Sequence, residues 1–590
     1  MQRYKGEIME KILLTILLLF SFSLKINAQI TTGERPIGFD LKNKINFEEL
    51  PIIKLMPPDL QKVAEEDKLM EEIYGYSNRF AYPINANFNI NNSGYWKTLE
   101  DGSKLWTLDL VFPNALSTSV IYNKFWLPEG TKFFIYNQKT LDCIGAITSK
   151  FIDGTYEAPE GFSTGIVLGE NVTFEYYQPA VVKGTPIIEI SRIDYGYRFM
   201  NHTLDAIKPS KNDNSFQQGF NSSGKCQVNI NCSPEGDNWQ EEKKAIVRIL
   251  IKAIGGTYWC SGALINNTKN DFRPYVLTAD HCLREFDALD KNDLKDWIFY
   301  WHYEHPFCNN SIEPTIYSTQ GATLVANNYP SDFALLELKQ DPRNINAISI
   351  LNLYYLGWDA SGSPGTGGVC IHHPSADVKK IATYNATPII SNCMGYIHQT
   401  VITANGTIDK RTINNDYWKV NFIATTNGHS VIEGCSSGSP LINSNRKIIG
   451  QLFGPGSCSP YPNCSNKNGI TNAGKFNVSW NGNTNIRRQL KYWLDPASST
   501  NQIVLNGIGY CPTTIVRGMQ TTKRIICKEI ILENATVPSG IKLELIATDK
   551  IIINSGVVIQ NGGTLELEAD GSVIINDGYT VEAGATFIIK

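Results

Sequence analysis

The chain carries little charge and has no long apolar segment. Charged residues make up 19% of its 590 residues, and the formal net charge is −4. A sequence without an excess of one sign lacks the basic surface that binds nucleic acid, and nothing in it suits an acidic substrate. No stretch after residue 28 is long and apolar enough for a membrane-spanning helix. We therefore expect no nucleic-acid partner and no transmembrane segment in the mature protein.

A compact apolar run, Ile12–Phe20, lies near the start of the chain. Basic residues precede it, and a small-residue end at Asn27-Ala28 follows it, which is typical of a secretory signal. Met9 could be the true start, since the residues from Met9 onward form a normal signal on their own. The sequence predicts a signal peptide over residues 1–28 and a protein that is secreted or held at the cell surface.

The length of the chain exceeds what one hydrophobic core supports, so several domains are expected. Over residues 29–204, short alternating strands bounded by Gly, Pro and Asn predict a β-sandwich. Residues 205–225 are polar and rich in Ser and Asn, which is typical of a linker and a processing site. Residues 226–508 form the next unit, and a second linker spans 509–528.

The last part of the chain, residues 529–590, repeats every 22 residues. Val537, Ile559 and Val581 occupy equivalent positions, and so do the pairs Ser539-Gly540, Asn561-Gly562 and Ala583-Gly584, each of which ends in glycine. A fixed period of short strands with Gly and Asn corners predicts a short β-solenoid. The expected fold class is therefore all-β and multidomain.

Three separated residues suggest a nucleophile and its base. Ser437 stands in the small-residue string GCSSGSP at 434–440, His281 in YVLTADHC at 275–282, and Asp332 in SDFALLEL at 331–338. A serine hydroxyl is a poor nucleophile until a base takes its proton. The order His, Asp, Ser resembles the chymotrypsin-type triad, in which His281 is general base and then general acid, and Asp332 orients it. The N–H groups of Cys435 and Ser437 would form the oxyanion hole, and no cofactor or metal is needed.

The resemblance extends over residues 226–508, about half of the chain. This part resembles the secreted lysyl endopeptidases of bacteria, a branch of the trypsin-like serine proteases. The strings that carry it are CQVNINCSPEGD at 226–237, YWCSGALINNTKNDFRPYVLTADHC at 258–282, CIHHP at 370–374, GCSSGSPL at 434–441, IIGQL at 448–452 and LKYWLDPAS at 490–498.

This resemblance implies two antiparallel β-barrels with the triad between them, and cleavage of peptide bonds in protein or peptide substrates. It also implies that residues 29–204 are a propeptide, which acts on its own protease unit and is later removed. A permanent accessory domain is the alternative. The tail resembles stacked-β modules of secreted Bacteroidetes proteins and would serve export, surface retention or adhesion, or simply cap the fold.

Thirteen cysteines in an exported chain predict disulfides. The family resemblance implies the pairs Cys226–Cys458, Cys232–Cys308 and Cys260–Cys282. Proximity in sequence suggests Cys511–Cys527 and Cys370–Cys393, and the position of two further cysteines near the substrate pocket suggests Cys435–Cys464. The odd count leaves at least one thiol outside an intramolecular disulfide.

The expected specificity pocket lacks the acid that a basic substrate side chain requires. Val431 stands six residues before the nucleophile, where trypsin-like enzymes place a carboxylate, and Thr471 stands where lysyl endopeptidases place one. Phe453 replaces the family's His, and Glu433 is the only nearby acid. Burying an unpaired ammonium costs several kcal/mol. We therefore predict a preference for apolar or aromatic side chains rather than Lys or Arg.

Two alternatives remain open at this stage. Cys435 occupies a position that is usually Gly in the family, and a side chain there could tilt an oxyanion donor and leave a catalytically weak surface-binding protein. The other alternative is a lysyl endopeptidase with an unidentified specificity acid. Ser436 precedes the nucleophile where trypsin-like zymogens carry an Asp, so the usual activation ion pair is unavailable.

Overall fold

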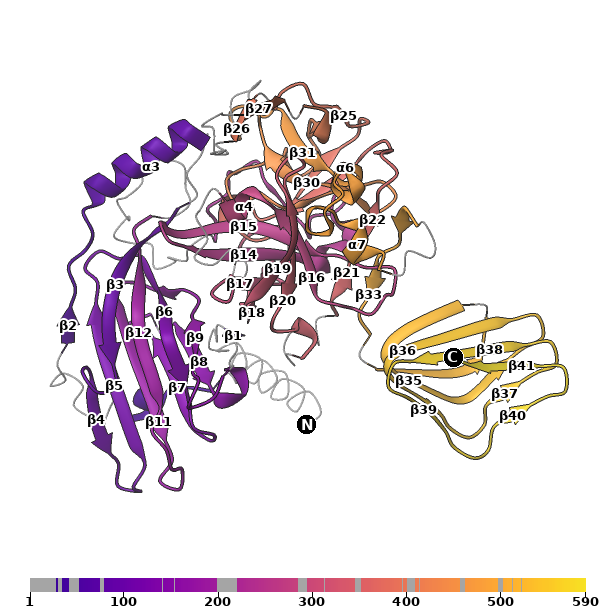
Figure 1. The fold of residues 1–590 in the computed structure, drawn as a ribbon, viewed down its shortest axis with the longest axis horizontal. Helices are drawn as coiled ribbons and strands as arrows, with labels where there is room; N and C mark the ends of the chain where they lie inside the picture. The colour runs from indigo at the N-terminus through magenta and orange to yellow at the C-terminus, as the bar shows by residue number, and fades with distance from the viewer. Residues whose placement is uncertain are drawn as a thin grey trace, which may run out of the picture.

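The structure is a computed structural model of the whole chain, and its elements are mostly β-strands (Figure 1). It describes residues 28–29, 34–41, 52–74, 79–198 apart from 141 and 153, 220–284, 294–344 apart from 312, 352–399 apart from 395, 409–456 apart from 413, 462–496 and 502–590 apart from 512 and 522. The predicted signal peptide, apart from Ala28, and most of the 205–225 linker lie outside these residues.

The N-terminal unit consists of two β-sheets that enclose one core. Trp106, Phe125 and Phe174 are fully buried between the sheets, which is the layering of a β-sandwich. One sheet contains β3 (Ala81–Asn89), β12 (Ile187–Gly196), β6 (Ser117–Trp126), β9 (Glu160–Ser163) and β10 (Val167–Leu168). The other contains β2 (Ile52–Lys54), β4 (Tyr95–Thr98), β5 (Lys104–Val111), β7 (Lys132–Tyr136), β8 (Cys143–Ile147) and β11 (Asn171–Gln178). Helices α2 (Ile37–Leu41) and α3 (Leu60–Tyr74) belong to this unit.

The central unit contains two nearly closed β-barrels. The first contains β14 (Ile246–Ala253), β15 (Gly256–Leu264), β16 (Tyr275–Ala279), β17 (Ile298–Trp301), β18 (Tyr317–Gln320), β19 (Ala322–Asn328) and β20 (Phe333–Leu338), and Ala28–Gln29 (β1) pairs with β18. The second contains β13 (Val228–Asn229), β22 (Gly357–Asp359), β23 (Gly368–His372), β24 (Lys380–Tyr384), β25 (Ile389–Ile390), β28 (Tyr417–Val420), β29 (Pro440–Asn443), β30 (Lys447–Gly454), β31 (Thr471–Lys475) and β32 (Val504–Leu505).

Shorter elements complete the central unit. They are α4 (His281–Arg284), α6 (Phe476–Asn481), α7 (Lys491–Leu494), the pair β21 (Tyr354–Tyr355) and β33 (Ile508–Gly509), and the hairpin β26 (Tyr396–Gln399) and β27 (Asp409–Thr412). Trp358, Phe476 and Trp480 stack on one another, so α6 seals the core that the barrels share.

The N-terminal unit joins the first barrel through a junction that contains buried charged side chains. Thr257 of β15 pairs with Ala81 of β3, and this bridge makes the two units' strands one continuous sheet. Asp194 of β12 accepts a hydrogen bond from Lys252 of β14 at 2.6 Å, and both side chains are 0% exposed. Arg192 Nη1 donates to Ala253 O at 2.6 Å. A buried charge requires a partner, so this junction is a built interface rather than a loose contact.

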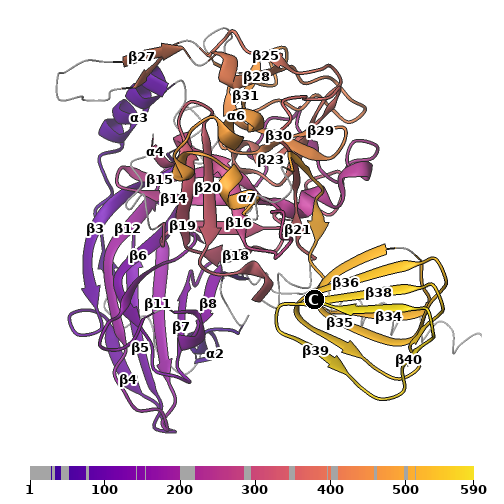
Figure 2. The ribbon, with the colours of Figure 1, turned by 45° about the vertical axis from the view of Figure 1, so that its right-hand side comes forward.

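The C-terminal unit stacks parallel strands at the expected period (Figure 2). Leu543, Leu565 and Phe587 lie in register on successive strands, and Asn576 Nδ2 donates to Asn554 Oδ1 at 2.8 Å. This stacking of equivalent residues in parallel strands is the geometry of a β-solenoid. The strands are β34 (Thr513–Met519), β35 (Lys523–Val537), β36 (Lys542–Ile553), β37 (Val558–Ile559), β38 (Thr564–Ala569), β39 (Ser572–Ile575), β40 (Thr580–Val581) and β41 (Thr586–Ile589).

Within the described ranges, every helix is too short or too polar to cross a membrane.

Candidate active site

His281 and Asp332 lie together at the end of the first barrel. β16 ends at Ala279, and His281 begins α4 directly beyond it, while Asp332 immediately precedes β20, the neighbour of β16. His281 Nδ1 lies 2.8 Å from Asp332 Oδ2, and the His281 backbone N–H donates to Oδ1 at 2.8 Å. Two contacts with one carboxylate fix the plane of the imidazole, which is the orienting role that the triad requires.

The second barrel supports the turn that carries Asp332. Gln451 of β30 donates from Nε2 to Ser331 O at 2.6 Å, and Ser479 of α6 donates to Ser331 Oγ at 2.9 Å. Asp332 adopts a φ of +56°, a left-handed conformation that costs an ordinary residue free energy. Contacts from both barrels therefore hold Asp332 in place. Through its two bonds to His281, Asp332 in turn orients the imidazole.

Ser437 lies on a turn that is packed against the strands leading to His281. Its carbonyl accepts a hydrogen bond from Ser261 N–H at 2.8 Å, and β29 begins three residues later. Gly438 has a φ of +81°, and a Cβ there would lie 2.2 Å from Thr278 Oγ1. Only glycine tolerates this conformation and this close approach. The glycine therefore places the Ser437 turn against β16, the strand that ends beside His281.

Cys435 takes the backbone conformation that a glycine would take. Its φ is +74°, and its carbonyl accepts a hydrogen bond from Ser261 Oγ at 2.8 Å. A residue with a side chain pays about 1–2 kcal/mol in this region, so neighbouring contacts must hold it there. Its side chain is fully buried beside Phe80, Trp259 and Ala376. The thiol thus points toward the junction with the N-terminal unit.

His372 is a site residue to which sequence reasoning gave no part in the turn. Its Nδ1 lies 2.8 Å from Oγ of Ser436, the residue directly before Ser437. Burial, and to a lesser degree the charge of Lys380, lowers the pKa of His372 to about 3, so the ring is neutral at working pH. A neutral contact therefore occupies the place where trypsin-like zymogens use an Asp. The string CIHHP contains the residue, but its partner is 64 positions away.

The three predicted pocket residues lie apart in the sequence of the second barrel: Val431 in the segment before β29, Phe453 on β30 and Thr471 on β31. Val431 and Thr471 are buried, and Thr471 opens β31 opposite Val420. The Phe453 ring contacts the His281 ring edge to face, with centroids 5.4 Å apart, and contacts Tyr417 at 5.5 Å. Of the three predicted pocket residues, Phe453 is therefore the one that contacts the His281 imidazole.

Glu433, the acid near Ser437 in the sequence, is hydrogen-bonded within the protein. Its Oε1 accepts hydrogen bonds from Gly224 N–H at 3.0 Å and from Gln227 Nε2 at 2.9 Å, and its Oε2 accepts from Ser375 Oγ at 2.6 Å. Its side chain is 4% exposed. Both carboxylate oxygens accept hydrogen bonds from the protein, so Glu433 stabilises the turn that contains Ser437.

Known proteins resemble this central unit. The family model for the lysyl endopeptidase C-terminal domain matches residues 220–469. A lysyl endopeptidase of Pseudomonas aeruginosa is 25% identical over 234 residues, which are 38% of this chain and 46% of that protein. Residues 220–469 are thus similar to the C-terminal domain of the lysyl endopeptidases, which are serine-type endopeptidases. The chain spans less than half of that curated relative.

Solved serine proteases resemble the chain at low structural similarity. A serine endoprotease from Yersinia pestis is 15% identical with a TM-score of 0.24, and the likeness covers 41% of this chain and 63% of that one. The thermostable serine protease AL20 from an extremophilic microorganism is 11% identical with a TM-score of 0.25, over 40% of this chain and 92% of that one.

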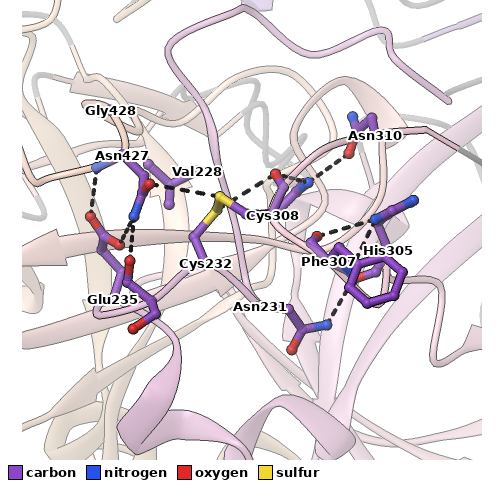
Figure 3. The surroundings of a disulfide bond; sticks show 12 residues. Val228, Asn231, Cys232, Glu235, His305, Phe307, Cys308, Asn310, Asn427 and Gly428 are labelled. Atoms are coloured by element: carbon purple, nitrogen blue, oxygen red, sulfur yellow. Dashed lines mark hydrogen bonds between the residues drawn. A yellow bond between two sulfur atoms is a disulfide. The ribbon is translucent and has the colours of Figure 1, made fainter.

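Three of the expected disulfides are present. Cys232 bonds to Cys308, Cys260 to Cys282 and Cys511 to Cys527. The Cys260–Cys282 bond ties the residue after His281 to β15. Figure 3 shows the Cys232–Cys308 bond beside Asn427, which donates from its backbone N–H to Glu235 at 2.9 Å. Several disulfides are typical of proteins that fold in an oxidising, extracytoplasmic compartment.

The other three expected pairings are wrong. Cys226 bonds to Cys464 rather than to Cys458. This bond also excludes Cys435–Cys464, because Cys435 is free and its thiol lies in the Phe80 cluster instead. Cys370 is free in the core of the second barrel while Cys393 is disulfide-bonded, so these two are not paired. Cys458 lies outside the described residues.

The free thiols are expected to resist alkylation in the native protein. Cys143, Cys370 and Cys435 are buried, and loss of hydration raises the pKa of each thiol well above its usual value. Native full-length protein that retains the N-terminal unit should carry no label at these positions after treatment with iodoacetamide at pH 8, and the same protein unfolded in urea without reductant should carry label at all three. Rapid native labelling of Cys435 would show that the turn opens to solvent.

Proposed function

We propose that the chain is an exported serine endopeptidase that hydrolyses peptide bonds through an acyl-enzyme formed on Ser437. The main support for this proposal is the pair of contacts between His281 and Asp332. The backbone N–H of His281 donates to Oδ1, and its Nδ1 lies 2.8 Å from Oδ2. Because Asp332 engages Nδ1, Nε2 is the nitrogen left for proton transfer. The Ser437 turn packs against β16, the strand that ends beside this imidazole.

The reaction assigns one role to each residue. Ser437 Oγ attacks the carbonyl carbon while His281 takes its proton, and the carbonyl oxygen becomes an oxyanion. The N–H groups of Cys435 and Ser437 donate to that oxygen. His281 then protonates the leaving amine, and a water molecule repeats the sequence on the acyl-enzyme. Asp332 stabilises the imidazolium throughout.

The glycine-like backbone of Cys435 supports an active enzyme over a surface-binding protein that has lost activity. The inactive alternative was based on the expectation that a side chain at this position tilts the Cys435 N–H away from the oxyanion. The φ of +74° gives Cys435 the left-handed geometry that glycine would adopt, and its thiol is buried in the cluster with Phe80, Trp259 and Ala376. The turn therefore keeps its donor despite the substitution.

The pocket around Val431, Phe453 and Thr471 is proposed to accept apolar or aromatic side chains. The engagement of Glu433 supports this, because both of its oxygens are bonded within the protein and are not available to a substrate cation. Burial of apolar surface contributes roughly 25 cal/mol per Å², so a phenylalanine side chain gains more there than alanine.

Matched peptide substrates with Phe, Leu, Ala, Lys or Arg before the scissile bond test this specificity. We expect kcat/KM for Phe or Leu to exceed that for Lys and Arg by about tenfold or more, because one uncompensated ammonium costs several kcal/mol. A tenfold preference for Lys would contradict the proposal and would support a lysyl endopeptidase whose acid comes from elsewhere in the chain.

The remaining segments are proposed to serve export and control. Residues 1–28 direct export, the N-terminal β-unit acts as a propeptide released by cleavage within 205–225, and the repeat unit at 529–590 attaches the protein to its surface or transport partner. Separating secreted protein by mass tests the second point: the mature form should lack the N-terminal unit, or retain it as a separate chain held at the junction.

A further inference from the structure

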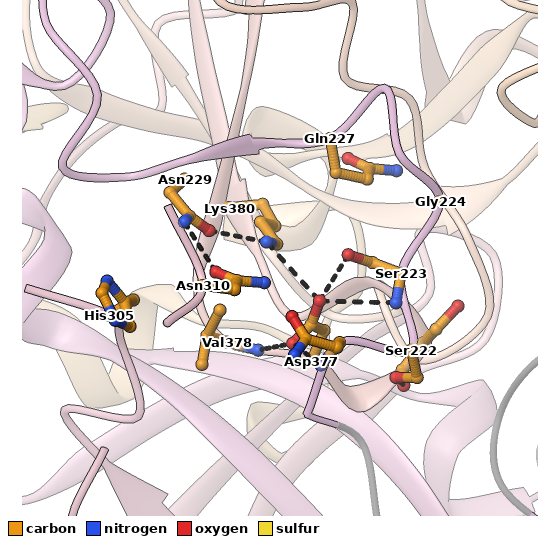
Figure 4. Close-up of polar contacts among 12 residues, drawn as sticks. Ser222, Ser223, Gly224, Gln227, Asn229, His305, Asn310, Asp377, Val378 and Lys380 are labelled. Carbon is orange, nitrogen blue, oxygen red and sulfur yellow. Dashed lines mark hydrogen bonds and ion pairs between the residues drawn. The ribbon is translucent and has the colours of Figure 1, made fainter. Parts of the chain in front are cut away.

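The segment that follows the linker is bonded into the protease unit near the nucleophile. Asn221 N–H donates to Asp377 Oδ1 at 2.9 Å. Ser223 donates from Oγ to Asp377 Oδ2 at 2.5 Å (Figure 4). Gly224 N–H donates to Glu433 at 3.0 Å. The composition of 205–225 is typical of a linker, yet its last residues are held by two buried carboxylates. Asn221–Gly224 is called the docking segment below.

The docking segment is linked to the oxyanion turn through Ser375. Ser222 Oγ donates to Ser375 O at 2.6 Å. Ser375 Oγ donates to Glu433 Oε2 at 2.6 Å, and Ser375 N–H donates to Gly434 O at 2.7 Å. Ser375 is fully buried, so none of these bonds competes with bulk water. One serine thus bonds to the docking segment and to both residues that precede Cys435.

The bond to Gly434 O sets the direction of the proposed oxyanion donor. Gly434 C=O and Cys435 N–H belong to the same planar peptide unit, and in a trans peptide they point in opposite directions. A donor that holds the carbonyl oxygen on one side therefore holds the N–H on the other. If this peptide rotated, the N–H would leave the oxyanion hole, and the loss of one such donor costs about 10²–10³ in rate.

Ser375 is itself in a conformation that needs support. Its φ is +50°, and that of Ala376 is +59°, two successive left-handed residues without glycine. Such a pair costs a few kcal/mol in isolation and persists only when surrounding contacts hold it. Arg248 supplies one contact by donating to Ala376 O at 2.7 Å, and Ser222 supplies the other by donating to Ser375 O.

We infer that Ser375 is a positioning residue for the oxyanion hole, and that the docking segment holds Ser375 in its working conformation. This inference rests on the proposed endopeptidase function. It provides a link between the linker region and catalysis without the Asp-to-N-terminus ion pair that Ser436 excludes. Seating of the docking segment completes the hole, and displacement of the segment frees the Gly434–Cys435 peptide to rotate.

The test compares Ser222→Ala, Ser222→Thr and Ser375→Ala with Ser233→Ala, all made in the full chain and processed identically. Ser233 is a matched control because its Oγ donates to Asp237 at 2.8 Å in a nearby exposed turn. Each variant is measured for kcat and KM on the best substrate of the panel, and for the inhibition constant of a peptide aldehyde of the same sequence. The aldehyde forms a tetrahedral adduct whose oxygen occupies the hole.

We expect Ser222→Ala and Ser375→Ala to lower kcat by about tenfold or more, with KM within about threefold, because the hole acts in the transition state. Aldehyde affinity should fall by the same factor as kcat, Ser222→Thr should restore both, and Ser233→Ala should change neither. Unchanged kcat and aldehyde affinity in Ser222→Ala would overturn the inference even if thermal stability fell, and so would a loss confined to KM. If the wild-type protein neither cleaves substrate nor binds aldehyde, the proposed function fails instead.

Discussion

Replacement of Ser437 by alanine is expected to lower kcat by about 10⁶-fold, and replacement of His281 by alanine by a similar factor, because the nucleophile and its base act as one unit. Asp332→Asn should cost about 10⁴-fold, since the amide favours the wrong imidazole tautomer. The double variant Ser437→Ala, His281→Ala should be no worse than either single one. The measurement is kcat on the best peptide substrate.

Ser444→Ala provides the matched control for these variants. Ser444 is exposed in the turn that follows β29, seven residues from the nucleophile. It should retain full activity, and all variants should keep the circular dichroism spectrum of the wild type. Near-normal activity in His281→Ala would show that another group is the base and that the pair with Asp332 is only structural.

Loss of Asp194 is expected to give the largest effect on stability. Lys252 and Arg192 both lie against this carboxylate, so Asp194→Asn leaves two cations without a full negative charge. Breaking a buried ion pair from one side costs about 3–5 kcal/mol. Glu189→Gln on the same strand is the control, because its pair with Lys124 is exposed and spans 3.5 Å, and such pairs contribute about 0–1 kcal/mol. Urea unfolding followed by circular dichroism measures both.

The Asp194 contribution should depend on pH in a defined window. Burial alone would raise its pKa, but Lys252 and Arg192 lower the pKa of Asp194 to about 2 from its ordinary value of 3.8. A lowered folded-state pKa stabilises the protein above the unfolded value and loses that stabilisation as pH falls through the folded value. The stability difference between wild type and Asp194→Asn should therefore be constant from pH 7 to about 4 and shrink toward pH 2. If the difference in the free energy of unfolding stayed constant down to pH 2, the stabilisation by Asp194 would come from packing rather than from its charge.

Local patterns allowed much of this molecule to be predicted. The alternation of apolar residues and the 22-residue repeat led to strands and to a stacked register such as Leu543, Leu565 and Phe587. His281 and Ser437 stand in strings whose local geometry follows from small residues, as Gly438 illustrates. These features are determined by residues close to one another in the sequence, so local patterns are enough to predict them.

Features that depend on distant contacts were missed or wrong. Cys458 and Cys464 lie only six residues apart in the sequence, so local patterns could not tell which of them pairs with Cys226; the partner is Cys464. The last residues of the 205–225 linker have a linker's composition, but Asp377, more than 150 positions away, holds them in place. The Asp194–Lys252 bond likewise joins two units that sequence analysis treated separately.

Active-site labelling tests the central claim most directly. A fluorophosphonate probe phosphonylates a serine only when a base and an oxyanion hole activate it. Incubation of the processed protein with the probe, followed by peptide mapping, should place one label on Ser437, with no label in His281→Ala or in heat-unfolded protein. An unlabelled Ser437 in folded, processed protein, or a label on another serine, would contradict the claim that this chain is a serine endopeptidase acting through Ser437.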